Sequence, residues 1–225
     1  MEKRIRKQFT KELENIKKRI LALGALVEER VQMAIKAIDT NDSDLAQQII
    51  KTDYEIDEAE VELEEECLKV LALHQPMAID LRFIIAAIKI NAELERIGDQ
   101  AVNIAERVGV TAKREQLDFY FDYSLMGEKA QAMLKMSLDA LIQLDYDLAF
   151  KVVMMDDEVD KIKSEAYDKI KKAMGENPDK IGYLINLFLI SRHLERLGDH
   201  ATNIAEQVVY LVEGEIIRHA PYPQD

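Results

Sequence analysis

Acidic residues recur along this chain in pairs whose spacing suits metal binding. Asp53 and Asp57 are four residues apart, as are Glu95 and Asp99, and the same spacing returns in the second half. Residues four apart lie on one face of an α-helix, one turn from each other. Carboxylates held this close repel one another unless they are protonated, paired with basic residues or bound to a cation. The paired acids are Asp53, Asp57, Glu95, Asp99, Asp156, Asp160, Glu195 and Asp199.

These acids belong to an internal repeat. Residues 93–106 and 193–206 are identical at ten of 14 positions, and the identical positions include acids and an arginine as well as apolar residues. A repeat that served only to build a core would reproduce its apolar spacing and not its charges. The repetition therefore predicts two related units, each with its own set of carboxylates.

Long helices must position the acids, because the chain of 225 residues has only eight Gly and four Pro to interrupt its elements. No useful length alternates with a period of two, so strands are not expected. Short connections make neighbouring helices antiparallel, which gives an up-down-up bundle in each half. The predicted helices cover residues 3–39, 44–73 and 77–109, then 118–144, 146–174 and 179–213.

The fold class predicted from this pattern is all-α, with two tandem three-helix bundles. The first bundle is assigned to residues 1–110 and the second to 118–225, with residues 111–117 as the linker. The linker segment lacks apolar periodicity, whereas both flanking segments have it.

The turn between the second and third helices of each half brings the acids to one level. Counted from residue 75, Asp57 and Glu95 are 18 and 20 residues away, and Asp53 and Asp99 are 22 and 24. A mismatch of two residues is only about 3 Å along a helix. The same count from residue 176 agrees almost as well in the second half. The four carboxylates of each half are therefore expected to converge.

Sets of ligands made only of carboxylates favour hard cations such as Mg²⁺, Ca²⁺, Mn²⁺ or iron. Further oxygen ligands are left open among Glu60, Glu64, Asn103, Glu106, Asn203 and Glu206.

Two other interpretations compete with a metal-binding regulator. Acids at this spacing more often form a solvated helix face, as in a helical scaffold without metal. A carboxylate-bridged di-iron enzyme would use Glu-x-x-His pairs, which the sequence lacks.

Net charge, cysteine content and the lengths of the apolar runs limit the functions that this chain can have. The net charge of −13 argues against a nucleic acid partner, since there is no excess of Lys and Arg to neutralise phosphates. The single Cys67 fits a reducing, cytoplasmic location. The first residues lack the apolar region of a signal peptide and no apolar run is long enough to span a bilayer, so no membrane insertion is expected. No nucleophile–base pair or phosphate-cradling glycine loop is present, so we expect no catalytic residues, no organic cofactor and no enzymatic activity.

The motifs resemble the PhoU family, the accessory and regulatory proteins of phosphate transport. The resemblance covers nearly the whole chain and is strongest at Pro76, at 80–82, at 94–99 and at 194–206, with the family's E(D)xxxD motif at all four acidic pairs. It implies two three-helix bundles, cytoplasmic location and negative regulation of the phosphate response. It also implies contacts with the ATPase of a phosphate ABC importer and with a sensor histidine kinase, a homodimer, and metal at the repeated motifs. Iron is the favoured ion, with Mg, Mn and Ca as alternatives.

One departure separates the two halves. The acidic stripe after Asp57 continues with Glu60 and Glu64, whereas the positions after Asp160 hold Lys163 and Tyr167. The two sites are therefore expected to differ in the number of ions they hold or in affinity.

Overall fold

The structure, a computed structural model, describes residues 2–115, 117–119 and 121–217. These residues form seven α-helices and one short 3-10 helix, with no strand among them, which confirms the all-α prediction. The elements are α1 (Glu2–Thr40), α2 (Ser43–Lys51), α3 (Tyr54–His74), α4 (Ala78–Thr111), α5 (Tyr123–Gln143), α6 (Tyr146–Glu176), η1 (Pro178–Lys180) and α7 (Ile181–Glu213).

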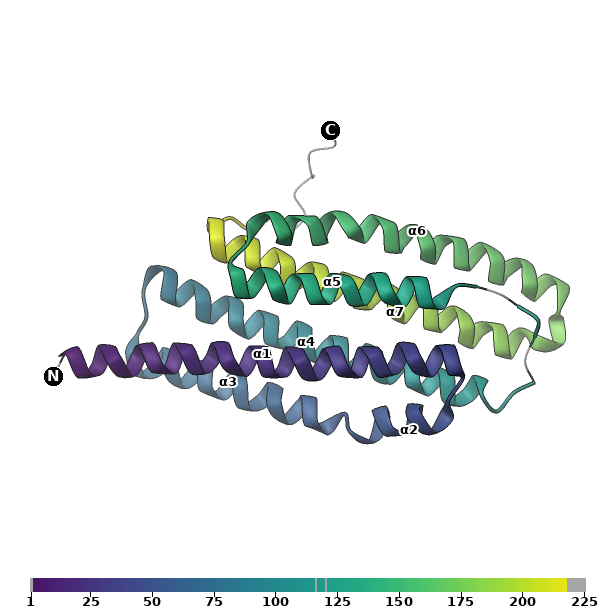
Figure 1. Cartoon of the computed structure of the whole chain (residues 1–225), viewed down its shortest axis with the longest axis horizontal. Helices are drawn as coiled ribbons and strands as arrows, with labels where there is room; N and C mark the ends of the chain where they lie inside the picture. Colours follow the sequence, from purple (N-terminus) through teal and green to yellow (C-terminus); the bar gives the residue numbers. More distant parts are fainter. Residues whose placement is uncertain (1, 116, 120, 218–225) are drawn as a thin grey trace.

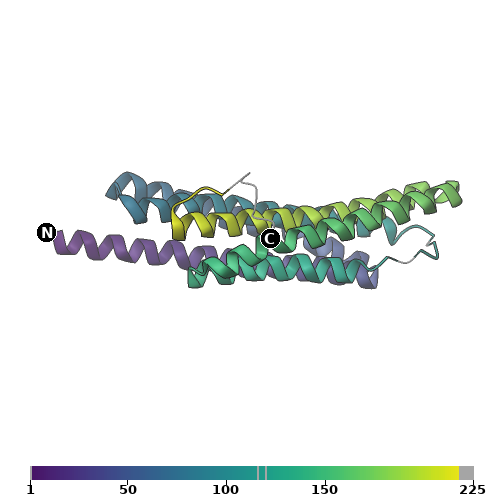
Figure 2. The same ribbon diagram turned by 90° about the horizontal axis from the view of Figure 1, so that it is seen from above.

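The helices run along the length of an elongated bundle (Figure 1). Seen from above, α1 and α5 lie in one layer, and α3, α4, α7 and α6 lie in the other (Figure 2). Helices α4 and α7, which carry the repeated motif, make the most extensive contact with each other. The two copies of the motif therefore lie next to each other in the middle of the molecule.

The apolar stripes of α4 and α7 face the core. Leu94, Ile97 and Ile104 of α4 are 0% exposed, and so are their repeat counterparts in α7. Buried residues from both halves form one continuous cluster. The assignment of residues 1–110 and 118–225 to separate units stays a prediction. None of the described helices is apolar enough over sufficient length to cross a membrane.

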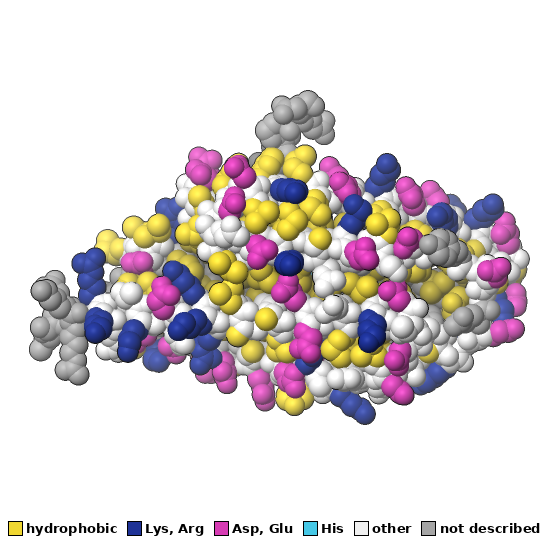
Figure 3. All heavy atoms as spheres, viewed as in Figure 1, with side chains coloured by type: hydrophobic (Ala, Val, Ile, Leu, Met, Phe, Trp, Pro, Cys, Tyr) yellow, Lys and Arg dark blue, Asp and Glu magenta, His cyan; other side chains and the backbone are white. Residues whose placement is uncertain are grey.

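The layer formed by α1 and α5 presents charged side chains of both signs with apolar side chains between them (Figure 3). A groove of about 410 Å³ opens between the N-terminal half of α1, the start of α4 and the end of α5, lined by Leu21, Ile79, Ile142 and Leu144 among others. None of the paired acids lines this groove. This groove is thus separate from the carboxylates.

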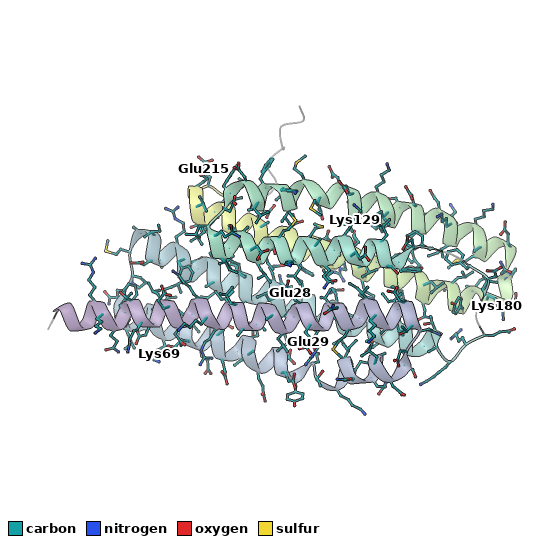
Figure 4. The ribbon with its side chains drawn as sticks, viewed as in Figure 1. Glu28, Glu29, Lys69, Lys129, Lys180 and Glu215 are labelled. Carbon is teal, nitrogen blue, oxygen red and sulfur yellow. The ribbon has the colours of Figure 1, made fainter. Side chains whose placement is uncertain are left out.

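Polar side chains join neighbouring helices at the surface. Lys129 of α5 donates a hydrogen bond to Glu158 of α6, and Lys180 of η1 pairs with Glu115 in the connection before α5 (Figure 4). Glu28 of α1 lies toward α5. The pKa of its carboxyl is raised, because burial and the charge of Asp139 outweigh the lowering by Lys135. Exposed pairs of this kind contribute little stability, so the core is what holds the helices in register.

The second helix of the first half is interrupted, which corrects the expectation of one helix over 44–73. Helix α2 ends at Lys51, and α3 begins at Tyr54. The hydroxyl of Thr52 bonds back to the carbonyl oxygens of Gln48 and Ile49 at 2.9 and 3.4 Å. Such back-bonding competes with the helical ladder and bends helices. The repeat counterpart of Thr52 is Met155, which has no hydroxyl, and α6 continues through it unbroken.

The connection between the halves is longer than the predicted 111–117. Helix α5 begins at Tyr123 and not at residue 118, because Asp122 caps it by accepting a hydrogen bond from the backbone N–H of Leu125 at 2.9 Å. A side chain that satisfies one of the unpaired N–H groups of the first turn defines where a helix starts. Asp42 does the same for α2.

The repeated glycines allow close packing to different degrees. A Cβ atom on Gly98 would lie 2.9 Å from Cδ1 of the buried Ile56 in α3. A Cβ atom on Gly198 would be 3.6 Å from Sδ of Met133 and 3.7 Å from Oδ1 of Asp156, which is ordinary contact. Gly98 is thus needed for the approach of α3 to α4, whereas the space beside Gly198 admits a methyl group.

We expect alanine to have opposite effects at these two positions. Alanine in a helix interior is favoured over glycine by about 1 kcal/mol, so Gly198→Ala should raise the free energy of unfolding by up to that amount. Gly98→Ala should lower it by roughly 1–2 kcal/mol, because the added methyl group overpacks Ile56. Gly109→Ala in the same helix, with no atom near its Cβ, is the control. Urea unfolding measures all three, and equal gains for Gly98→Ala and Gly109→Ala would contradict the packing argument.

Candidate metal centre

The first cluster consists of Asp53, Asp57, Glu95 and Asp99. Asp53 is the residue immediately before α3, Asp57 is in the first turn of that helix, and the other two lie in the middle of α4. Glu95 and Asp99 turn away from the buried stripe of α4 and are only partly buried or exposed. The break between α2 and α3 therefore places Asp53 at a helix start, where its carbonyl oxygen accepts the backbone N–H of Ile56 at 2.8 Å.

Mutual repulsion marks the first cluster as a group. Burial raises the pKa of Asp53, and the carboxylates of Asp57 and Asp99 raise it further. The pKa of Glu95 is raised by burial and by Asp99, Asp57 and Glu60, against a lowering by Arg96. The pKa of Asp99 is raised by burial and by Asp57. The structure thus brings the four acids of the first half within range of one another.

Glu60 and Asn91 extend the first cluster. Burial, Glu64 and Asp57 raise the pKa of Glu60. The fully buried Asn91 donates from Nδ2 to the backbone oxygen of Glu60 at 2.9 Å and to its Oε1 at 3.2 Å. Asn91 precedes Glu95 by one turn of α4, and its Oδ1 has no hydrogen-bond partner. Glu60 was among the additional ligands left open from the sequence, whereas Asn91 was missed, because no motif distinguishes a buried amide.

A basic residue from the other layer also reaches the first cluster. Arg30 of α1 is 6% exposed and pairs with Glu55. Its charge lowers the pKa of Asp53, in opposition to the larger effect of burial. The sequence gives no sign of this contact, because Arg30 and Asp53 belong to different helices and share no motif.

The second cluster consists of Asp156, Asp160, Glu195 and Asp199, on α6 and α7. It contains a lysine: Nζ of Lys163 lies 2.8 Å from Oε1 of Glu195 and 3.8 Å from Oδ1 of Asp160. The hydrogen bond to Glu195 raises the pKa of Lys163 and outweighs the opposing effect of burial. The second cluster therefore contains a direct ion pair with a basic residue. In the first half, Arg30 and Arg96 pair with Glu55 and Glu93 and act on the cluster only through their charge.

Repulsion among the remaining acids of the second cluster is nonetheless strong. Burial, and after it the carboxylates of Glu195, Asp156 and Asp160, together raise the pKa of Asp199 to about 6, against a smaller lowering by His200. The pKa of Asp156 is raised mainly by burial and by Asp160. The four acids of the second half thus lie within electrostatic range of one another, as those of the first half do.

Polar contacts join the two copies of the motif where α4 meets α7. Glu93 accepts hydrogen bonds from His200, with Nδ1 at 2.8 Å, and from Asn203 at 3.0 Å. Nδ1 of His193 lies 3.0 Å from Oε1 of Gln100. Residues 93 and 193 are repeat counterparts, as are 100 and 200, so the two contacts are related by the repeat. The histidines and Asn203 thus serve the contact between halves.

The donors fit a hard cation, although ion binding requires the side chains to move closer together. Among the described residues, no three or more His, Cys, Asp or Glu side chains are gathered as a metal site in their present positions. The donor set of the first cluster consists of oxygen atoms only, which suits Mg²⁺, Ca²⁺, Mn²⁺ or iron. The unpartnered Oδ1 of Asn91 is a further neutral oxygen ligand on the same helix. Ion binding at these eight acids stays a prediction.

The fold and the clusters define a class of protein: a helical bundle built from a repeat, with a carboxylate group between the second and third helices of each half. The chain belongs to the PhoU family. The model of the PhoU domain matches twice, at residues 20–108 and 123–208. Both matches include one complete cluster, so the family's domain is the repeat unit seen in the sequence.

Curated relatives match over almost the whole chain. A phosphate-specific transport system accessory protein PhoU homolog of Pseudomonas aeruginosa is 41% identical over 96% of this chain and 89% of its own length. The homolog of Aquifex aeolicus is 39% identical over 93% and 95% of the two chains. PhoU of Serratia marcescens is 34% identical over 97% and 90%.

Solved structures confirm the architecture. The crystal structure of PhoU from Pseudomonas aeruginosa matches with a TM-score of 0.89 and 40% identity, covering 92% of this chain and all of that one. The phosphate transport system regulatory protein PhoU from Streptococcus pneumoniae matches with a TM-score of 0.83 and 32% identity, covering 92% and 98%. These matches confirm the family that the sequence motifs predicted.

Proposed function

We propose that this chain is a metal-binding accessory protein of phosphate-specific transport that regulates uptake by binding partners and not by catalysis. The observation that carries this proposal is the match of the family's domain to both repeats, each of which contains a complete carboxylate cluster. Curated relatives that match more than nine-tenths of the chain are named accessory proteins of phosphate-specific transport.

The partners we propose are the ATPase of a phosphate ABC importer and a sensor histidine kinase, which would place the protein in the cytoplasm. The ion, with iron favoured and Mg²⁺, Mn²⁺ or Ca²⁺ as alternatives, would supply positive charge between α3 and α4 or between α6 and α7. The chain's own part is to hold four carboxylates at one level and to stabilise the helix pair when their repulsion is relieved.

A helical scaffold without metal is the second candidate. It is favoured by the present side-chain positions, in which no three potential ligands are gathered in the described part of the chain. A di-iron enzyme is disfavoured, because such sites take a Glu-x-x-His pair from each of two helices and the sequence contains none.

Two measurements on the wild type test the proposal. Elemental analysis of protein purified without added metal should find an ion in amounts close to stoichiometric. In gel filtration, the purified ATPase of a phosphate importer should comigrate with this chain. A DNA duplex, tested at micromolar protein and low salt, should not comigrate with the chain, because a net charge of −13 leaves no excess of basic residues to bind phosphates. Protein free of metal that also fails to bind the ATPase would rule out the proposed function.

A further inference from the structure

The two clusters differ at one corresponding position. Asp57 and Asp160 are repeat counterparts, and three residues later α3 has Glu60 and α6 has Lys163. Both side chains turn toward their own cluster: Glu60 interacts electrostatically with Asp57, and Lys163 pairs with Glu195. The first half thus adds a fifth carboxylate at the place where the second half adds an ammonium group.

Surrounding residues hold each of these side chains in place. In the first half, the buried Asn91 donates hydrogen bonds to the backbone and side chain of Glu60. In the second half, the counterpart of Asn91 is Ser191, which bonds to Phe188 within its own helix, and Lys163 spans from α6 to Glu195 of α7. The difference therefore involves both helices of each pair.

The next turn continues the asymmetry. Glu64 follows Glu60 on the acidic stripe, and its charge raises the pKa of Glu60. Its counterpart Tyr167 packs its ring against Phe188, with centroids 5.8 Å apart. The acidic stripe of α3 thus extends about two turns further than that of α6, in which the last acid on the stripe is Asp160.

We propose that Lys163 is the internal counter-ion of the second cluster and competes with a metal ion for it, so that the two halves bind ions with unequal affinity. This inference rests on the proposed metal binding. An ion entering the second cluster must displace the ammonium group from Glu195, which breaks a charge-assisted hydrogen bond. The side chain of Lys163 is 33% exposed, so it has a path into solvent when displaced. The first cluster fills at a lower ion concentration, and the second fills only when Lys163 is displaced.

Mn²⁺ titration of metal-free protein, followed by calorimetry and by the electron paramagnetic resonance of free Mn²⁺, tests the inference. The wild type should show two classes of site that differ at least about tenfold in Kd, or roughly 1.4 kcal/mol. Lys163→Gln should tighten the weaker class by about tenfold or more, because it removes the competing charge. The matched control is Lys161→Gln, at an exposed lysine two residues away on the same helix, and it should change neither class.

Two further variants keep the test decisive if Lys163→Gln folds poorly, which circular dichroism will show. Lys163→Arg retains the charge and should leave the weaker class weak. Glu60→Lys introduces the competing charge into the first half and should weaken the tighter class by about tenfold or more. Each Lys163 variant is also titrated with Glu95→Gln and Asp99→Asn present, so that binding by the second cluster is read alone.

The outcomes separate this inference from the function on which it rests. If the sites of the wild type have the same Kd, and Lys163→Gln and Glu60→Lys do not change it, the role of Lys163 is overturned and metal binding stands. Absence of Mn²⁺, Fe²⁺ and Mg²⁺ binding in every variant would overturn the proposed function itself.

Discussion

Replacing Glu95 by Gln and Asp99 by Asn in one chain should weaken ion binding in the first half by more than about 100-fold. Loss of residues that merely support metal ligands already costs 10–100-fold in affinity, and these two are proposed as ligands themselves. The fold should persist, because both changes are nearly isosteric and relieve repulsion that raises the pKa values of Asp53 and Glu95. Metal content by elemental analysis and the thermal unfolding midpoint with and without ion measure the effect.

The matched control is the same pair of changes in the second half, Glu195→Gln with Asp199→Asn. Each double variant should lose binding only in its own half. Without ion, stability of the first-half variant should stay level or rise, whereas with ion the wild type should gain more, since only a folded site binds tightly. If both double variants retain the full metal content of the wild type, the acids form a solvated face and are not the ligands of the ion.

Asp199→Asn should stabilise the metal-free protein more at neutral pH than in acid. The pKa of Asp199 in the folded chain is about 6, against an ordinary value of 3.8. A carboxyl whose folded pKa is raised opposes folding most above that pKa, and the penalty is relieved as the pH falls from 6 toward 3.8. The full shift would be worth roughly 3 kcal/mol. Asp199 is only half-buried, so screening by solvent reduces the expected gain at pH 7.5 to about 1–2 kcal/mol.

Urea unfolding in the presence of a chelator at pH 7.5 and 4.5 measures this effect. The difference between variant and wild type is diagnostic, because other groups also change stability over this range. Burial lowers the pKa of His193, so protonating it below its ordinary value of 6.5 opposes folding. Asp168→Asn, an exposed position on α6, is the control and should give no difference that depends on pH. A gain for Asp199→Asn that is equal at both pH values would refute the electrostatic origin.

The placement of the paired acids could be predicted because it depends on local geometry. Pro76 locates one turn and Gly175 to Pro178 the other, and the rise of a helix converts residue counts into heights. The presence of helices could be predicted from the apolar stripes, but the residues at which the helices start could be predicted only in part. The capping role of Asp122 and the break after Thr52 depend on single side-chain hydrogen bonds, which apolar periodicity does not register.

The polar surroundings of the clusters could not be predicted in the same way. Asn91 and Arg30 approach the first cluster from positions that no motif marks. His193 and His200 stand at positions where the two copies of the repeat differ, so the repeat does not single them out, yet they make contacts that join the halves. Burial decides the behaviour of such residues, and burial depends on which helices pack against each other.

The amino-acid sequence by itself determined the repeat, the helical class, the family and the eight carboxylates, because each of these is expressed in residues close together along one helix or around one turn. It also showed that Lys163 replaces an acid. Only the tertiary structure decided that Lys163 bonds to Glu195, that Arg30 faces Asp53, and that the two motifs meet through the α4–α7 contact. These contacts join residues from different helices, and their distances follow from the packing of the core and not from spacing along the chain.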